Sequence, residues 1–196
     1  MYDRKIGDEV LTLEASGALQ DAALIMRDRE TNSWWSMMRA VGIGGTHDGT
    51  PLPETPLGEK VQWKEWVARH PQTKVLSVEG ETFVAENVYA SYFTSDKQAF
   101  DHQSGDDRLA GKAPIYTFRW NDTPYAISHA EIEGGLELTL PDTDVTVSFF
   151  RETGASVFAN TAAFRVGDDG ERERLAGFDT YWYVWITQNR ETVLLP

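Results

Sequence analysis

Apolar and polar residues alternate with a period of two in several parts of the chain, at residues 10–15, 136–140 and 145–149. This period places successive side chains on opposite faces of a β-strand. Two further apolar segments flank the sequence Asn-Asp-Thr-Pro at residues 121–124, which is typical of a hairpin turn. The pattern predicts a chain made mainly of antiparallel strands.

Residues 18–28 fit two patterns. Leu19, Ala22 and Met26 have helical spacing, whereas residues 24–26 form a short apolar run that suits a buried strand. Turn-forming residues follow at once at 29–33. We therefore favour a strand here.

Residues 59–69 carry the clearest helical pattern. Trp63, Trp66, Val67 and His70 stand at positions i, i+3, i+4 and i+7, which form one face of an α-helix. Pro71 ends the pattern, since the residue before a proline is disfavoured in helical conformation.

The same arrangement returns at the end of the chain. Residues 62–76 read QWKEWVARHPQTKVL, and residues 181–195 read YWYVWITQNRETVLL. Each copy has two tryptophans three residues apart, a threonine seven residues after the second, and then an apolar pair. We interpret each copy as a short helix, a turn and an apolar strand, with the tryptophans in the core because they bury a large apolar area.

These elements predict a β-rich α+β fold. We expect antiparallel strands in a curled sheet or barrel, with two short tryptophan-bearing helices in pseudo-symmetric positions. The 196 residues suit a single domain, 1–196. Possible internal halves are 1–88 and 112–196, joined by an irregular excursion at 89–111.

Composition excludes several classes of function. The chain has 18 basic and 31 acidic residues and a net charge of −13, so it lacks the basic surface that nucleic acids require. It has no cysteine, which removes disulfides and zinc–thiolate sites. No apolar run is long enough for membrane insertion, and the first residues, MYDRKIGDEV, contain no signal peptide. We expect a soluble acidic protein whose partner is a small molecule or a protein. The sequence indicates neither a cofactor nor a cellular location.

Three histidines are candidates for chemistry. His47 and Asp48 lie in a long Gly/Pro-rich loop, a common place for functional residues, and His102 lies in the irregular excursion. His129 and Glu131 stand two apart on a probable strand, a spacing that can supply two metal ligands from one face. Alternatively, His47 and His102 are ordinary solvent-exposed loop histidines, and His129 and Glu131 are an ordinary exposed pair on a strand.

A ligand site is also conceivable around Arg29. Its guanidinium could bind a ligand in a pocket walled by Trp34 and Trp35, with His47 nearby. Arg29 could instead pair with a buried carboxylate and fix the turn that contains it.

Part of the chain resembles a known family. The blocks are DRETNSWW at 28–35, the loop ending in Leu-Pro at 52–53, and WKEWVARHPQTKVL at 63–76. They resemble a largely bacterial domain of unknown function, DUF3179, which also tends to repeat the tryptophan motif near its C-terminus. Residues 112–130 are similar to its middle segment.

Two departures from the family pattern limit what this resemblance implies. Relatives usually carry a Cys-Pro-Leu-Cys-like segment upstream, which this sequence lacks, and the second tryptophan copy has Asn189-Arg190 in place of His-Pro. Relatives are often exported, but the resemblance implies no activity.

Two functional hypotheses remain open. The first is a ligand-binding or interaction module with an aromatic-walled pocket. The alternative is a small metal-assisted or acid/base enzyme that uses His47, His102 or His129.

Overall fold

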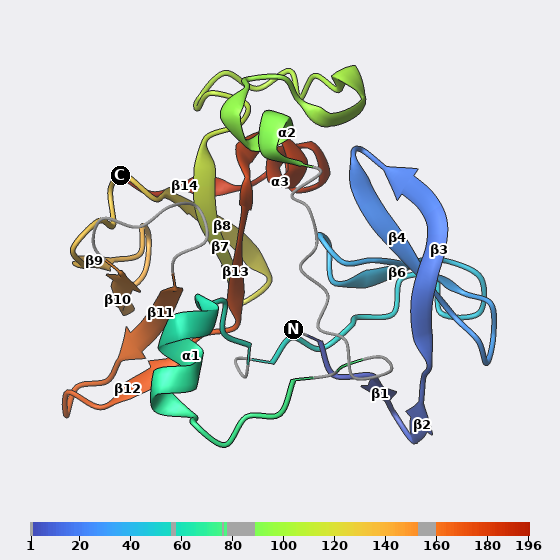
Figure 1. Cartoon of the computed structure of the whole chain (residues 1–196), viewed down its shortest axis with the longest axis horizontal. Helices are drawn as coiled ribbons and strands as arrows, with labels where there is room; N and C mark the ends of the chain where they lie inside the picture. Colours follow the sequence, from blue (N-terminus) through green and yellow to red (C-terminus); the bar gives the residue numbers. More distant parts are fainter. Residues whose placement is uncertain (1, 56–57, 76, 78–88, 153–159) are drawn as a thin grey trace.

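The computed structural model of the chain describes residues 2–55, 58–75, 77, 89–152 and 160–196. Three four-stranded sheets contain most of the regular structure, with short helices outside and between them (Figure 1). A two-stranded hairpin, β1 (Lys5–Ile6) and β2 (Glu9–Val10), precedes the first sheet.

The N-terminal sheet has the strand order β3-β4-β5-β6, and every neighbouring pair is antiparallel. Its strands are β3 (Leu13–Gln20), β4 (Ala23–Asp28), β5 (Trp34–Ser36) and β6 (Val41–Gly44). One face packs on a small core of Leu11, Trp35 and Leu52. The apolar run at residues 24–26 thus lies in a strand, as we predicted.

The central sheet has the order β13-β7-β8-β14. Its strands are β7 (Pro114–Trp120), β8 (Thr123–Ser128), β13 (Gly177–Tyr181) and β14 (Val193–Leu194). A two-residue turn joins β7 to β8, and both Asn121 and Asp122 have positive φ, as type I′ hairpins require. Helix α3 (Trp182–Gln188) follows β13 directly, and the chain then returns as β14, parallel to β8.

The third sheet has the order β12-β11-β10-β9 and is antiparallel throughout. Its strands are β9 (Leu136–Thr139), β10 (Thr146–Arg151), β11 (Thr161–Val166) and β12 (Arg172–Arg174). The largest apolar cluster joins this sheet to the central one, with Phe118 and Tyr125 stacked 5.3 Å apart against Phe149. The β-rich α+β prediction is confirmed, but the sheets of the described residues do not close into a barrel.

Helix α1 (Trp63–Arg69) and helix α3 share their local conformation. The residues that cap their C-terminal ends, His70 and Asn189, have φ/ψ of −129/68° and −133/63°. The indole N–H of Trp66 donates to Thr73 Oγ1 at 2.9 Å, and that of Trp185 donates to Thr192 Oγ1 at 2.8 Å. The matching sequence spacings therefore produce matching helix–turn units.

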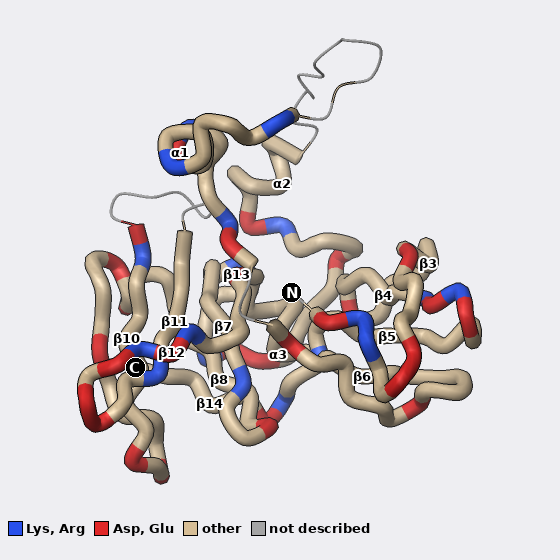
Figure 2. The backbone as a smooth tube through the Cα atoms, turned by 90° about the horizontal axis from the view of Figure 1, so that it is seen from below, with Lys and Arg blue, Asp and Glu red and all other residues tan. Residues whose placement is uncertain are grey.

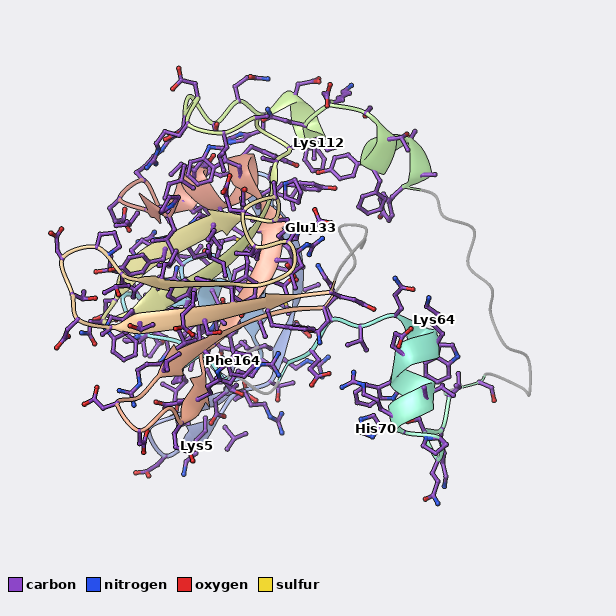
Figure 3. The ribbon with its side chains drawn as sticks, turned by 90° about the vertical axis from the view of Figure 1, so that its left-hand side faces the viewer. Lys5, Lys64, His70, Lys112, Glu133 and Phe164 are labelled. Carbon is purple, nitrogen blue, oxygen red and sulfur yellow. The ribbon has the colours of Figure 1, made fainter. Side chains whose placement is uncertain are left out.

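The two helices differ in burial. Trp182 and Trp185 are fully buried against Ile115, Ala126 and other residues of the central sheet. In α1 no residue is buried, and the Trp63 side chain is 55% exposed. Figure 3 shows α1, marked by Lys64 and His70, standing outside the body of the molecule. Our assignment of the first tryptophan pair to the core is wrong.

The residues between the tryptophans explain this difference. Helix α3 reads WYVWITQ and is apolar on several sides, whereas α1 reads WKEWVAR and carries charges next to its apolar face. A helix that is apolar on most sides is typically buried, whereas one with charged residues beside its apolar face keeps a large part of its surface in water. The apolar strand predicted after the turn that follows α1 is also not formed at the described residues 74 and 75.

The excursion at 89–111 contains only short helical segments among its described elements. It holds helix α2 (Ala90–Thr94) and the 3₁₀ turn η1 (Ala99–Asp101). Helices α1 and α2 lie on the same side of the molecule, outside the layer formed by the sheets (Figure 2). In the described part of the chain no helix has the length and apolarity needed to cross a membrane.

Candidate functional site

The predicted ligand residues Arg29, Trp34 and Trp35 point in different directions. Trp34 and Trp35 are consecutive on β5, so their side chains lie on opposite faces of the sheet. Trp35 is buried and donates its indole N–H to Asp28 Oδ2 at 2.9 Å, whereas Trp34 is 39% exposed. Arg29 is exposed and donates to Glu14 Oε2 at 2.6 Å. The structure does not bring these three side chains around one pocket.

His47 and Asp48 lie in a loop that is closely packed on the N-terminal sheet. The His47 ring lies 5.4 Å from the Trp35 ring, and its backbone N–H donates to Ser33 Oγ at 3.1 Å. A Cβ atom on Gly42 would lie only 1.9 Å from the His47 carbonyl oxygen, so glycine is required for this close approach. Asp48 is exposed at the end of the same loop.

The remaining predicted histidines lie elsewhere. His102 Nε2 lies 3.0 Å from Thr187 Oγ1 on helix α3. His129 and Glu131 lie in the turn after β8 rather than on a strand, with Glu131 exposed and His129 buried. The partner of His129 is Asp179, at 2.7 Å. Among the described residues no group of three or more histidine, aspartate or glutamate side chains could hold a metal ion.

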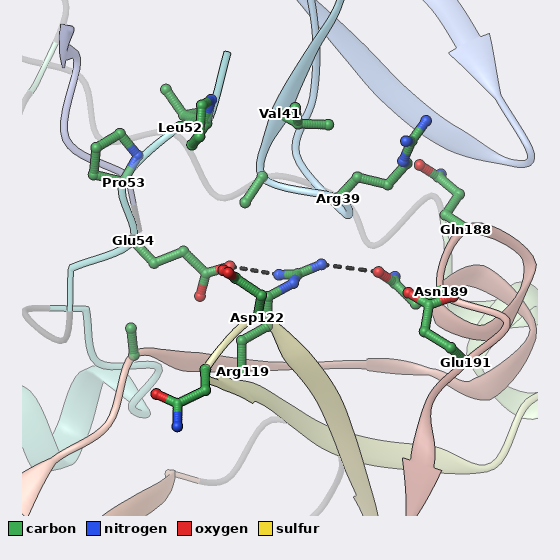
Figure 4. Close-up of a pocket in the computed structure, with 14 residues that line it drawn as sticks. Arg39, Val41, Leu52, Pro53, Glu54, Arg119, Asp122, Gln188, Asn189 and Glu191 are labelled. Atoms are coloured by element: carbon green, nitrogen blue, oxygen red, sulfur yellow. Dashed lines mark hydrogen bonds and ion pairs between the residues drawn. The ribbon is translucent and has the colours of Figure 1, made fainter. Parts of the chain in front are cut away.

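A cavity lies between the N-terminal and central sheets (Figure 4). It has a volume of about 730 Å³. Its walls come from the loop before β6 and from β6 itself, the segment 51–54, the β7–β8 turn and the end of α3. The cavity is therefore assembled from parts of the chain that are far apart in the sequence.

Arg119 organises this cavity. It lies near the end of β7, and its guanidinium donates to Glu54 Oε1 at 2.6 Å, to the Met38 carbonyl oxygen at 2.7 Å and to Asn189 Oδ1 at 2.9 Å. The guanidinium also lies over the Trp185 ring, 5.0 Å from its centre. A planar guanidinium can satisfy several acceptors and stack on an aromatic face at once. Arg119 thereby links both sheets to helix α3, as the dashed lines in Figure 4 show in part.

Asn189 has the matching role on the helix side. Its backbone N–H and its side-chain Nδ2 both donate to the Trp185 carbonyl oxygen, at 3.1 Å each, and so end the helix. Nδ2 also lies 3.3 Å from the Met38 carbonyl oxygen. This leaves Oδ1 directed at Arg119, which fixes the position of the guanidinium.

The cavity lining has more acidic than basic side chains. Glu54 is largely buried, and burial raises the pKa of its carboxyl while the charge of Arg119 lowers it; the net pKa lies above its usual value. Arg39, Asp122 and Glu191 are exposed at the rim. Three carboxylates and two guanidinium groups give the lining a formal charge of −1. Once Arg119 and Glu54 neutralise each other, one cation and two anions remain to face a ligand.

Sequence reasoning did not identify Arg119, Glu54 or Asn189. Two signals were present: Asn189 occupies the position in the second tryptophan segment that His70 has in the first, and Glu54 directly follows the Leu-Pro end of the loop. Neither signal shows that the side chains meet, because Arg119 is 65 residues from Glu54 and 70 from Asn189.

Comparison with known proteins identifies one family. The family model described as "Protein of unknown function (DUF3179)" matches residues 1–192. Searches of curated proteins and of solved structures gave no match.

Proposed function

The chain belongs to the DUF3179 family, and on this premise we propose that it is a binding module for a small amine-bearing molecule, held in the cavity at Arg119. The observation that carries this proposal is the nearly buried Arg119–Glu54 pair, which fixes one wall of a cavity of about 730 Å³. Small-molecule sites typically have volumes of about 300 to 1,000 Å³ and a few fixed polar groups.

The rim charges favour the amine. Asp122 and Glu191 are two exposed carboxylates on the lining, and they form no ion pair with any described residue. Arg39 contributes a single guanidinium, which suits a carboxylate on the same ligand. A molecule of amino-acid size with a second amine therefore matches the charges better than a simple acid does.

The rigid wall supports binding rather than catalysis at this cavity. Arg119 already directs three of its five N–H donors at Glu54, Met38 and Asn189, so it acts as a positioning group and not as a free cation. Groups fixed before binding reduce the ordering cost of association.

A matched ligand series tests the proposal. The full chain is titrated by calorimetry with lysine, norleucine and hexanoate. Norleucine lacks the side-chain amine of lysine, and hexanoate lacks the α-amine as well. We expect affinity to decrease in that order. Replacement of both rim carboxylates, Asp122→Asn with Glu191→Gln, should weaken lysine binding at least tenfold, which corresponds to about 1.4 kcal/mol.

Asp142→Asn is the matched control. Asp142 is an exposed turn residue between β9 and β10, away from the cavity lining. Its replacement by asparagine makes the net charge less negative, as the rim substitutions do. Its positive φ of 58° is also tolerated by asparagine. Absence of lysine binding, or equal weakening by Asp142→Asn, would contradict the proposal.

A further inference from the structure

A second polar cluster lies on the other side of the central sheet from helix α3. Asp179 is in the middle of β13, where its Oδ1 lies 2.7 Å from His129 Nε2 and its Oδ2 lies 2.9 Å from Lys60 Nζ. His129 is 5% exposed and Asp179 is 8% exposed. The backbone N–H of His129 donates to the Pro114 carbonyl oxygen at 3.0 Å, which anchors the turn that carries the ring.

The cluster fixes the tautomer of His129. Burial raises the pKa of the Asp179 carboxyl, but His129 and Lys60 outweigh this effect and hold the pKa below its usual range. An ionised carboxylate only accepts hydrogen bonds, so the proton in the His129–Asp179 bond is on Nε2. In the neutral ring, Nδ1 then carries a lone pair.

Nδ1 is the unexplained atom of this cluster. It is buried and has no hydrogen-bond partner among the described residues. Buried polar atoms nearly always have a partner, so an exception needs an explanation such as local strain, a bound water or ion, or a catalytic role. The Asp179–His129 arrangement is also the one that catalytic dyads use, with the carboxylate on one ring nitrogen and the other nitrogen left for proton transfer.

A small pocket adjoins the cluster. It has a volume of about 160 Å³ and is lined by His129, Asp179 and Lys60 on its polar side and by Phe93, Pro114 and Tyr181 on its apolar side. This volume corresponds to about five water molecules in the liquid, so it suits one small ring or a short chain. The ligand must combine an apolar body with a hydrogen-bond donor for Nδ1.

We propose that His129, oriented by Asp179, is a general base in a second site that takes a small hydroxyl compound, a phenol or a short alcohol. In the step, the ligand O–H bond breaks, the electron pair stays on the oxygen, and a new N–H bond forms at Nδ1. The Asp179 carboxylate stabilises the imidazolium, and the imidazolium faces the new oxyanion. Lys60 holds the second carboxylate oxygen and so keeps Asp179 in position.

Entry of the ligand requires a wall to move, since Nδ1 has almost no accessible surface in the structure. We expect Phe93 to be the wall that moves, since it lies on the five-residue helix α2, which has no buried residue, and its side chain is 37% exposed. Side-chain rotations of this kind are fast for exposed residues.

Binding of p-nitrophenol to the full chain tests the proposal. The titration is done below the pKa of the free phenol, where the phenolate absorption band is weak. We expect the wild-type chain to increase this band in a saturable way, at least fivefold over the free probe. His129→Gln should abolish the increase, because the glutamine amide can still donate to Asp179 but has no atom equivalent to Nδ1. Asp179→Asn should bind the probe but lose most of the phenolate band, as expected for a positioning residue.

His70→Gln is the control, since His70 is an exposed histidine at the end of α1. If His129→Gln does not fold, ring-nitrogen NMR of the wild-type chain replaces it, and the phenol must shift Nδ1 of His129 and leave the other three histidines unchanged. The proposal fails if the wild type gives no saturable band, if His129→Gln retains the band, or if the probe shifts another histidine instead. The Arg119 cavity is unaffected by any of these outcomes, so this test is independent of the lysine titration.

Discussion

The two tryptophan helices allow a matched test of what burial contributes. We consider Trp66→Ala in α1 and Trp185→Ala in α3. Each indole donates to a threonine hydroxyl at the same distance within 0.1 Å, 2.9 and 2.8 Å. Each ring also has an arginine above it, with its guanidinium carbon at 5.7 and 5.0 Å from the ring centre. The main remaining difference is that Trp185 is fully buried and Trp66 is only partly buried.

The expected magnitudes follow from this difference. A tryptophan buries about 150–250 Å², which at about 25 cal/mol per Å² is roughly 4–6 kcal/mol for full burial. Measured losses for buried aromatic-to-alanine changes are about 3–5 kcal/mol. The lost hydrogen bond contributes about 1 kcal/mol in both variants and cancels in the comparison. We expect Trp185→Ala to lower the free energy of unfolding by at least about 2 kcal/mol more than Trp66→Ala does.

Urea denaturation followed by far-ultraviolet circular dichroism measures both values without depending on tryptophan fluorescence. The urea dependence of the free energy should stay the same for Trp66→Ala, because little surface changes state. Equal destabilisation by the two substitutions would refute the reasoning and would mean that α1 is packed against the rest of the protein in solution.

Three further predictions concern the central sheet and the cavity. The folded-state pKa of Asp179 is below its unfolded value, about 3.9, so its contribution to stability is present above that pH and is lost as pH falls through the folded pKa. Asp179→Asn should therefore destabilise the chain at neutral pH and converge with wild type in acid, and a pH-independent difference in melting temperature would contradict this. Gly177→Ala should cost about 1–3 kcal/mol, because its Cβ would lie 2.5 Å from a tyrosine hydroxyl oxygen, whereas Gly44→Ala meets no atom closer than 3.8 Å and should melt like wild type. Arg119→Gln should cost about 3 kcal/mol by leaving Glu54 buried and unpaired, and adding Glu54→Gln should recover part of that loss in a double-mutant cycle.

Local features were predictable from the sequence where neighbouring residues decide them. The positive φ at Asn121 and Asp122 follows from the chemistry of asparagine and aspartate in tight turns, and the strand at β4 follows from an apolar run closed by turn residues. The end of α1 at Arg69 follows from Pro71, which closes the helical pattern, whereas the helix begins at Trp63 and not at the predicted residue 59. None of these features depends on a distant part of the chain.

The candidate sites were not predictable in the same way. Sequence reasoning placed His129 beside Glu131, because they are two residues apart, but its partner is Asp179, 50 residues away. It likewise grouped Trp34 with Trp35, which the alternation of side chains along β5 separates onto opposite faces.

By itself, then, the sequence determined the β-rich class, the hairpin turns, the two helix–turn units and the acidic charge, since these depend on composition and on residues within one or two turns of each other. Only the tertiary structure decided which tryptophan helix is buried and which side chains meet at Arg119 and at Asp179. The physical reason is that burial and ion pairing depend on surfaces from separate sheets. Thus one spacing of Trp and Thr gives the same local hydrogen bonds in α1 and α3, yet only α3 is packed into the core.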